Sequence, residues 1–530
     1  MGTKQYDSAT DLLTFSRASG GTALRKISYG NNLVTNGTFD TDLSGWTTDT
    51  DWVYSNGKAA LLANAQAGRS LSSTKAYVKA GKTYRVRFDA STSVGTPSYT
   101  NMKLRIWGND NGTGAFIYNG AYIYTGSNEI FLSPTANGYM SFDNVISNSF
   151  DKFIDNVSIE EVLFDQADGT LQVYNHPNNI PRIEYDATGA VKGLLIEEAR
   201  TNLLPNSSLL NYLQFSTATS TSTVVSPSGL QDAVLVQPTV ASGITWVYLT
   251  TLFNTGVVTT ISTFAKASGK SFVTLSNSSG NLQYASFNLT TGAIGTVASG
   301  YTANMEDFSN GWYRCSVTTP TGFNDRSVYA VSDTDGGIAA AANGNDGILL
   351  YGAQLEAGSF PTSYIPTTGA AATRARDIAE IPTSAFGYNN DKGTVVCEFD
   401  SAKLNGSTVF TLDLDGAGTE NGITTIVYPA NRISYQAVTG GAVQANLNFD
   451  AYATASQVSK VATVYAKDDF AAVLNGGAVA TDTAASIPTV DLLRLGVYLR
   501  GASFPMSGHI KSIQYYPRRL TNTQLQELTT

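Results

Sequence analysis

The sequence predicts an all-β protein made of several antiparallel sandwiches. Its polarity comes from hydroxyl and amide side chains, because only 14% of the residues are charged while 11% are aromatic. Thr and aromatic residues suit pleated surfaces, and the helix formers Glu, Lys and Gln are scarce. A chain of 530 residues also exceeds what one hydrophobic core supports, and about 150 residues per domain gives three or four domains.

Residues 32–162 form the first predicted domain, which begins NLVTNGTFDTDLSGW and closes with FIDNVSIEEV. Both ends resemble the carbohydrate-binding-module type of jelly roll, which opens on an Asn-Gly-x-Phe element with a Gly-Trp and ends on an Asp-Asn-Val strand. The matching residues are Asn36, Gly37, Phe39, Gly45, Trp46, Asp155, Asn156 and Val157. The resemblance implies a jelly roll and binding of carbohydrate.

Residues 201–377 are predicted to form a second jelly roll, because part of the first domain recurs there. AYVKAGKTYRVRFDAS at 76–91 matches STFAKASGKSFVTLSNS at 262–278, with one inserted residue before the shared Gly-Lys. Apolar residues occupy every second position after that turn, as half-buried antiparallel strands require. The repeat predicts a strand, a Gly-Lys turn and a strand in both domains.

Residues 378–530 are predicted to form a third sandwich. Asn475-Gly476 supplies the positive φ angles of a two-residue hairpin turn. This region resembles laminin-G and concanavalin-like sandwiches, in which such a hairpin precedes a strand like the one with Gly508, Ile510, Ile513 and Tyr516. A short helix is predicted at the end, with Thr521 and Gln524 as its capping box and Leu520 and Leu525 as its hydrophobic staple.

Three ordered phrases resemble a module of bacteriophage tail and virion surface proteins. The first is PRIEYD at 181–186 with GLLIEEARTNLL at 193–204, the second is NGWYR at 310–314, and the third is GAQLEAGSFPTSYIPT at 352–367. The resemblance implies a virion structural protein that assembles in the host cytoplasm. Its implied partners are other virion proteins, copies of itself in a homo-oligomer such as a trimer, and a host-cell glycan.

The same family accounts for the N-terminus. LTFSRASGG at 13–21 resembles a strand that normally runs straight into Asp-Gly-x-Leu, but here that element appears at 168–171. We therefore predict that the first jelly roll is inserted into a small split β-element made of residues 1–31 and 163–200, since domain insertion is tolerated where chain ends lie close together.

Charge and cysteine content exclude several classes of protein. A net charge of -9 without a concentrated Lys/Arg surface argues against nucleic acid. Cys315 and Cys397 fall in different predicted domains at apolar strand positions, so we expect two buried free thiols. No signal peptide is expected at the N-terminus, and Pro and Gly interrupt the uncharged run of 33 residues at 233–265, so no membrane insertion is expected.

Catalysis, if present, is expected to use paired carboxylates, as in a polysaccharide depolymerase. The candidates are Asp413, Asp415 and Glu420, although Asp415-Gly416 also marks an ordinary turn. His176, expected in a loop, and His509, expected in a strand, lie far apart without a recognisable nucleophile, so a catalytic triad is not expected. The chain is therefore predicted not to be an enzyme.

Ligand binding has two sets of candidates, and neither implies a cofactor. Asp/Asn/Gly clusters at 109–114, 332–337 and 343–347 could hold Ca²⁺, but ordinary tight turns, in which these residues dominate, are the favoured interpretation. Sugar rings stack on exposed aromatic faces, and the first domain is richest in aromatics. The candidates for glycan contact are Trp52, Tyr54, Trp107, Tyr118 and Tyr122, with Tyr118 and Tyr122 expected on one face of their strand; the alternative is that most of them form the core.

Three functions remain open from sequence. The preferred one is a bacteriophage tail fibre, spike, head fibre or decoration protein that presents a glycan-recognising surface. The second is a phage polysaccharide depolymerase, and the third is a bacterial polysaccharide-binding adhesin.

Overall fold

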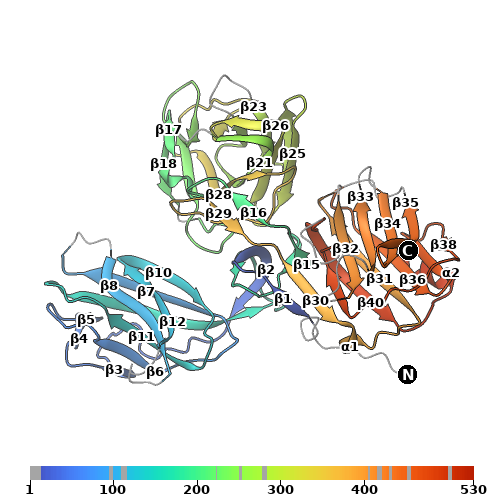
Figure 1. Ribbon diagram of the computed structural model, residues 1–530. Helices are drawn as coiled ribbons and strands as arrows, with labels where there is room; N and C mark the ends of the chain where they lie inside the picture. Colours follow the sequence, from blue (N-terminus) through green and yellow to red (C-terminus); the bar gives the residue numbers. More distant parts are fainter. Residues whose placement is uncertain are drawn as a thin grey trace. The chain divides into compact units, whose positions relative to one another are not determined.

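The computed structural model confirms an all-β protein (Figure 1). It describes residues 13–94, 99–108, 116–222, 224–249, 253–276, 283–403, 406–414, 421–428, 432–449, 455–498 and 504–530. Within these ranges the helices are α1 (Thr383–Phe386), α2 (Asn522–Thr529) and a 3₁₀ turn at Leu209–Asn211, and the sheets are built of antiparallel strand pairs.

The chain divides into two compact units. Lys26–Thr170 forms one unit, and Met1–Arg25 together with Leu171–Thr530 forms the other. The chain passes between them along β2 (Gly21–Tyr29) and at the start of β13 (Thr170–His176). The predicted insert at 32–162 lies within the first unit.

The Lys26–Thr170 unit is a two-sheet sandwich. One sheet has the order β3-β6-β11-β8-β9; the other has β10-β7-β12, with β5 and β2 also on β12 and β4 on β5. The strands are β3 (Trp46–Thr48), β4 (Trp52–Ser55), β5 (Lys58–Leu61), β6 (Ser70–Val78), β7 (Tyr84–Thr92), β8 (Tyr99–Trp107), β9 (Phe116–Tyr124), β10 (Gly126–Leu132), β11 (Gly138–Asn144) and β12 (Lys152–Phe164). Phe39, Trp46, Phe88 and Phe142 pack in its core.

The two ends of the first predicted domain meet in this unit. The Val157 amide donates to the Gly37 carbonyl at 2.8 Å, and a Cβ on Gly37 would lie 2.0 Å from the Val157 carbonyl oxygen. The Trp46 indole donates to the Asn36 carbonyl. The opening Asn-Gly and the closing Asp-Asn-Val therefore belong to one close backbone contact, which only glycine permits.

Residues 203–368 of the other unit contain the second sandwich, with sheets β17-β20-β27-β22-β23-β24 and β18-β19-β28-β21-β26-β25. Its strands are β17 (Leu213–Phe215), β18 (Thr217–Thr221), β19 (Val234–Pro238), β20 (Trp246–Tyr248), β21 (Phe253–Ser268), β22 (Phe272–Ser276), β23 (Gln283–Asn288), β24 (Ala293–Val297), β25 (Thr302–Asp307), β26 (Tyr313–Asp325), β27 (Val328–Ser332) and β28 (Gly347–Ala357). Trp312 is buried in this unit.

The internal repeat corresponds to the same connection in both sandwiches. Gly81-Lys82 joins β6 to β7, and Gly269-Lys270 joins β21 to β22. In each case the two strands belong to different sheets, so the Gly-Lys turn carries the chain from one layer to the other. The strand–turn–strand prediction is confirmed at both places.

The third sandwich has sheets β1-β30-β39-β32-β33-β34-β35 and β14-β15-β40-β31-β36-β37-β38. Its strands are β1 (Thr14–Ser16), β14 (Ile183–Tyr185), β15 (Val191–Ile196), β30 (Ile378–Pro382), β31 (Lys392–Ser401), β32 (Ser407–Asp413), β33 (Gly422–Tyr428), β34 (Arg432–Thr439), β35 (Ala442–Phe449), β36 (Ser459–Ala466), β37 (Phe470–Leu474), β38 (Ala480–Asp482), β39 (Leu492–Leu495) and β40 (Gly508–Tyr516). A further pair, β16 (Arg200–Asn202) with β29 (Ala372–Arg374), precedes it.

The two segments predicted to form a split β-element do pair, because β2 and β13 are neighbours in one sheet, but other strands of these segments join sheets of the third sandwich. β1 pairs with β30, and β15 pairs with β40, so each lengthens one sheet of the third sandwich. Gly193 makes the second pairing possible, because a Cβ there would lie 2.6 Å from the Ile510 carbonyl oxygen. The local sequence reveals a strand but not which edge it joins.

The C-terminal details are mostly confirmed. The Thr521 hydroxyl accepts from the Gln524 amide and the Gln524 side chain accepts from the Thr521 amide, which completes the capping box. Leu520 and Leu525 are buried in one cluster. The hairpin at Asn475-Gly476 exists with positive φ at both residues, but five residues, 475–479, separate its strands instead of two.

Candidate functional site

A row of aromatic side chains crosses one sheet of the Lys26–Thr170 unit. Tyr139 on β11 lies opposite Tyr77 on β6 and opposite Trp107 on β8. Trp107 in turn lies opposite Phe116 on β9. Four neighbouring strands therefore each place one aromatic ring in the same row, which extends for about 14 Å at ordinary strand spacing.

The row is on the outside of the sandwich. Met140 and Ile106, next to the row on the same strands, point to the core and are fully buried, so Tyr139 and Trp107 point outward. Tyr77 is 39% exposed and Phe116 is 44% exposed. The Tyr77 and Tyr139 ring centroids are 5.0 Å apart, and those of Trp107 and Phe116 are 4.4 Å apart. The row thus consists of two aromatic contacts, Tyr77 with Tyr139 and Trp107 with Phe116, and the rings at its two ends, Tyr77 and Phe116, are exposed.

Trp107 is the most buried ring of the row, and hydrogen bonds hold it in place. It is 9% exposed, and its indole N–H donates to the Ser141 hydroxyl at 2.8 Å and to an Asp143 carboxylate oxygen at 3.0 Å. These bonds fix the plane on which Phe116 packs. Trp107 is therefore a positioning residue for the exposed ring beside it.

A polar row lies next to the aromatic one. Arg105 on β8 is opposite Ser141 and Asn119. Its Nε donates to the Asn119 side-chain oxygen at 3.1 Å, and its Nη1 lies 3.2 Å from the buried Asp143 carboxylate. The guanidinium also stacks 4.1 Å from the Phe116 ring centroid. Amide, hydroxyl and guanidinium groups thus border the aromatic rings.

The five predicted contact residues separate into different places. Trp107 and Tyr122 lie on this face, and Tyr122, 40% exposed, stacks with the Lys103 ammonium 4.8 Å from its ring centroid. Trp52 is buried in the core at 4% exposure. Tyr54 is exposed but belongs to β4 in the other sheet, where its hydroxyl donates to the Asp40 carbonyl.

The expectation that Tyr118 and Tyr122 share a face is wrong because β9 contains a bulge. Lys103 pairs with Tyr122 and Arg105 with Asn119. The single residue between them on β8, Leu104, therefore lies opposite two residues of β9, Gly120 and Ala121. Tyr118 then pairs with the core residue Ile106 and packs inward. A Cβ on Gly120 would lie 2.8 Å from the Leu104 carbonyl oxygen, so glycine allows the strands to approach.

The sequence did not point to Tyr77, Tyr139 or Phe116. Their side chains meet only through the pairing of β6, β11, β8 and β9. Alternation along each strand could have placed Tyr139 outward from its neighbours Met140 and Phe142, but no local signal gives the register across strands.

A second polar site lies in the other unit. Arg17, Arg182 and Arg374 are at most 1% exposed. Arg17 and Arg182 both pair with Asp377, and Arg182 also pairs with Glu197 at 2.9 Å. Burial raises the pKa of the Glu197 carboxyl, but Arg374 and Arg182 outweigh burial and hold that pKa at about 2. Glu197 is therefore charged.

The first and third of the phrases that carry the family resemblance bind each other around this cluster. The Asn202 amide donates to the Ala353 and Ile365 carbonyls, and its oxygen accepts from the Leu355 amide at 3.1 Å. Glu197 accepts from both the amide and the hydroxyl of Ser363 at 2.7 Å. These residues join the second and third sandwiches, so the phrases have a structural use here.

His509 ties the PRIEYD segment to the third sandwich. Its Nδ1 lies 3.0 Å from Asp400, and its Nε2 lies 2.7 Å from Glu184. Burial lowers the pKa of the imidazole, but the hydrogen bonds to Asp400 and Glu184 outweigh it and raise that pKa to about 9. The imidazolium is held between two carboxylates, as in a structural ion triad. His176, expected in a loop, instead ends β13 and is buried.

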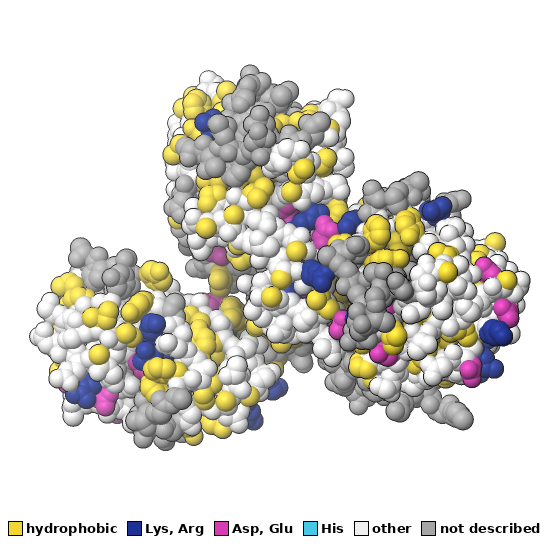
Figure 2. Space-filling view, in the orientation of Figure 1, with side chains coloured by type: hydrophobic (Ala, Val, Ile, Leu, Met, Phe, Trp, Pro, Cys, Tyr) yellow, Lys and Arg dark blue, Asp and Glu magenta, His cyan; other side chains and the backbone are white. Residues whose placement is uncertain are grey.

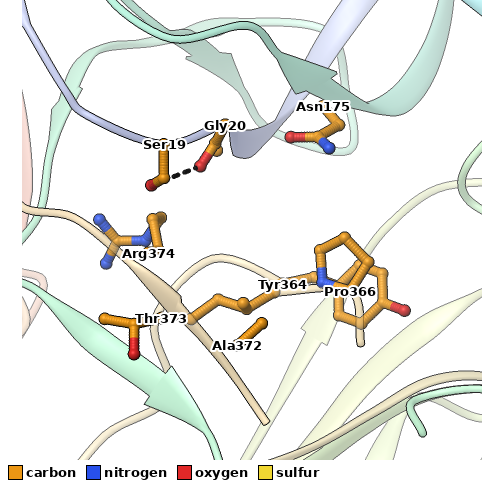
Figure 3. A pocket seen from close by; sticks show the side chains of 10 residues that line it. Ser19, Gly20, Asn175, Tyr364, Pro366, Ala372, Thr373 and Arg374 are labelled. Atoms are coloured by element: carbon orange, nitrogen blue, oxygen red, sulfur yellow. Dashed lines mark hydrogen bonds between the residues drawn. The ribbon is translucent and has the colours of Figure 1, made fainter. Parts of the chain in front are cut away.

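A small cavity of about 200 Å³ lies beside the arginine cluster (Figure 3). Ser19, Asn175, Tyr364 and Arg374 are among its lining residues. Arg374 lines it with its stem, while its Nη2 donates to the Glu198 carbonyl at 2.7 Å. Arg374 is the charged residue among the lining groups, and it is already engaged, so the cavity offers no acid–base pair.

Of the three carboxylates proposed for catalysis, the structure describes Asp413. Asp413 is 1% exposed and pairs with Arg494, which also binds Glu380. Asp415 and Glu420 lie outside the described residues. A buried carboxylate neutralised by arginine cannot easily exchange a proton with a substrate, so Asp413 is a poor general acid or base.

The acidic side chains of the candidate Ca²⁺ loops already bind protein groups. Asp333 pairs with Lys270, Asp335 accepts from Thr296, and Asp346 binds Asn343 within its own turn. The 109–114 loop lies outside the described residues. In the part of the chain that the structure describes, three or more His, Cys, Asp or Glu residues never gather in a way that could hold a metal ion.

Cys315 and Cys397 are both buried free thiols, as predicted. Burial raises the pKa of each thiol far above its usual range, which makes both unreactive. Among the described residues, neither helix is long and apolar enough to cross a membrane. Figure 2 shows that charged side chains are sparse on the face drawn, in line with the composition.

No protein-family model matches the chain, and no curated protein matches it. Among solved structures, the carbohydrate-binding module CBM40 of the Ruminococcus gnavus IT-sialidase bound to α2,3 sialyllactose is 19% identical, with 27% of this chain and 84% of that chain covered and a TM-score of 0.25. The NanB sialidase of Streptococcus pneumoniae is 17% identical (28% and 26% covered, TM-score 0.25). A SAP-like pentraxin of Limulus polyphemus is 14% identical (26% and 70% covered, TM-score 0.22).

Proposed function

We propose that this protein is a non-catalytic binding protein that holds a glycan on the outer face of β6, β11, β8 and β9. The observation that carries the proposal is the row Tyr77–Tyr139–Trp107–Phe116, with Arg105 and Asn119 beside it. The apolar face of a sugar ring stacks on aromatic rings, and its hydroxyls need amide and guanidinium partners at the rim. This face offers both over about 14 Å, a length that suits several linked sugars.

The finer proposal is that the protein stands on a bacteriophage particle, as a tail or head surface component, and presents this face to the host cell. The three ordered phrases support it. The first and third also bind each other at Glu197 and Asn202, which gives them a role in holding two sandwiches together. Mass spectrometry of purified particles tests this part. If the protein is not detected in purified particles whose genome encodes it, that result would contradict the virion proposal.

The binding proposal is tested with a glycan array probed by the full chain. The wild type is expected to bind at least one class of bacterial polysaccharide, and the double variant Tyr77→Ala/Phe116→Ala is expected to lose at least tenfold in affinity, since stacking on two rings contributes about 1 kcal/mol each. Tyr54→Ala is the matched control, because Tyr54 is 42% exposed but lies on the other sheet.

Two results would contradict the proposal. One is binding that survives the double variant but falls in Tyr54→Ala. The other is a change of oligomeric state in the double variant without any glycan bound by the wild type, which would make the aromatic row an interface between copies.

A further inference from the structure

Lys103 is a cation of the aromatic face that forms no ion pair among the described residues. It is half-buried on β8, directly opposite Tyr122 on β9 and Asp143 on β11. Its ammonium lies over the Tyr122 ring, and among the described residues no carboxylate lies within ion-pair distance of it. An ammonium group held against an exposed aromatic ring can pair with a negative charge on a ligand that stacks on that ring.

Asp143 does not supply that charge, because its carboxylate already has other partners. One oxygen accepts from Arg105 Nη1 at 3.2 Å and from the Trp107 indole at 3.0 Å, and the other accepts from the Ser141 hydroxyl at 2.7 Å. Asp143 is completely buried. Arg105 and Asp143 therefore neutralise each other, and among the described side chains of these four strands Lys103 keeps its positive charge.

We propose that the face takes an acidic polysaccharide, with a singly charged carboxylate or sulfate ester of one sugar on Lys103 while neighbouring rings stack on Tyr122 and Phe116. The inference rests on the proposed glycan-binding function and names its substrate class. The net charge of -9 does not oppose it, because charges more than about 8 Å away are largely screened at physiological ionic strength. The local charge decides, and here it is positive.

Polygalacturonate and the same polymer after carboxyl reduction are the main probes, with dextran sulfate and dextran as the second pair. Binding to the full chain is measured by affinity electrophoresis at low and high salt. The wild type is expected to prefer the charged member of at least one pair by about threefold to fivefold, the range of an exposed ion pair, and to lose the preference in high salt. The pair that shows the preference tells carboxylate from sulfate.

Lys103→Gln is expected to abolish the preference, while Lys103→Arg keeps it. Lys58→Gln, which removes the same charge from β5 in the other sheet, is the control and is expected to behave as the wild type. Equal binding of charged and neutral polymers by the wild type would overturn the inference and leave the glycan-binding proposal intact. A preference that survives Lys103→Gln, or falls equally in Lys58→Gln, would also overturn it. Failure to bind any of the four polymers or any arrayed glycan would sink both.

Discussion

The carboxylate of Asp377 pairs with the guanidinium of Arg17, which lies 360 residues earlier in the chain. Both side chains are fully buried, and Asp377 also pairs with buried Arg182. Replacing Asp377 by Ala would leave two buried guanidinium groups without this partner. We expect Asp377→Ala to lower the free energy of unfolding of the unit containing the second and third sandwiches by about 3–5 kcal/mol, measured by urea denaturation.

Two companion variants make that prediction specific. Asp377→Asn retains hydrogen-bonding oxygen but no charge, so its loss should be smaller than that of Asp377→Ala. Asp186→Ala changes a carboxylate that binds only its own turn, at Thr188 and Ala190, and should cost about 1 kcal/mol or less. Equal losses in Asp377→Ala and Asp186→Ala would show that the buried cluster does not hold this unit together.

The His509 triad predicts a pH dependence of stability. Because the pKa of the folded imidazole is raised from 6.5 to about 9, the folded state holds its proton at pH values where the unfolded state releases it. The contribution of about 3 kcal/mol is fully present below pH 6.5 and disappears as the pH rises to about 9. Urea midpoints of the wild type should therefore fall across this window, and those of His509→Gln should fall much less. An unchanged slope in the variant would contradict the assignment to His509.

The bulge in β9 depends on Gly120. A methyl group there would press on the Leu104 carbonyl oxygen, so Gly120→Ala should destabilise the Lys26–Thr170 unit by about 1–3 kcal/mol and weaken glycan binding together. Gly108→Ala is the control, because its nearest neighbour would be a flexible Ile117 methyl at 3.9 Å. Calorimetry of both variants checks this, and an equal effect at the two glycines would refute the role of close strand approach.

The cap of α2 gives a smaller, separate prediction. Thr521→Ala removes the acceptor for the Gln524 amide and should cost about 1 kcal/mol. Thr523→Ala, in the first turn and exposed, should have almost no effect or stabilise slightly. Thermal unfolding distinguishes the two, and a larger loss from Thr523→Ala would mean that the capping box contributes little.

Local patterns predicted local structure well. Thr521 and Gln524 capped the helix as expected, the Gly-Lys turns joined two strands in both repeats, and Cys315 and Cys397 were buried. Each of these depends on residues close in sequence. The edge positions of β1 and β15 depend instead on partners about 310 to 360 residues away, Ala379 and Ile510, which no local pattern encodes.

The site was predicted only in part for the same reason. Trp107 and Tyr122 were found because aromatic residues are conspicuous in sequence, but Tyr77 and Phe116 join them only through strand register. Tyr118 was misplaced because a bulge of one residue reverses every later side chain on the strand. Strict alternation cannot foresee such a bulge, although Gly120 within the strand was a usable signal.

Hydroxyl-radical footprinting of the full chain, with and without a polysaccharide that it binds, tests the central claim most directly. The account predicts that the ligand protects Tyr77, Phe116 and Tyr122 from oxidation and leaves Tyr54 unchanged, although Tyr54 is as exposed as Tyr77 and Tyr122. Protection of Tyr54, or of tyrosines in the second and third sandwiches, with no change at Tyr77 and Phe116 would contradict it.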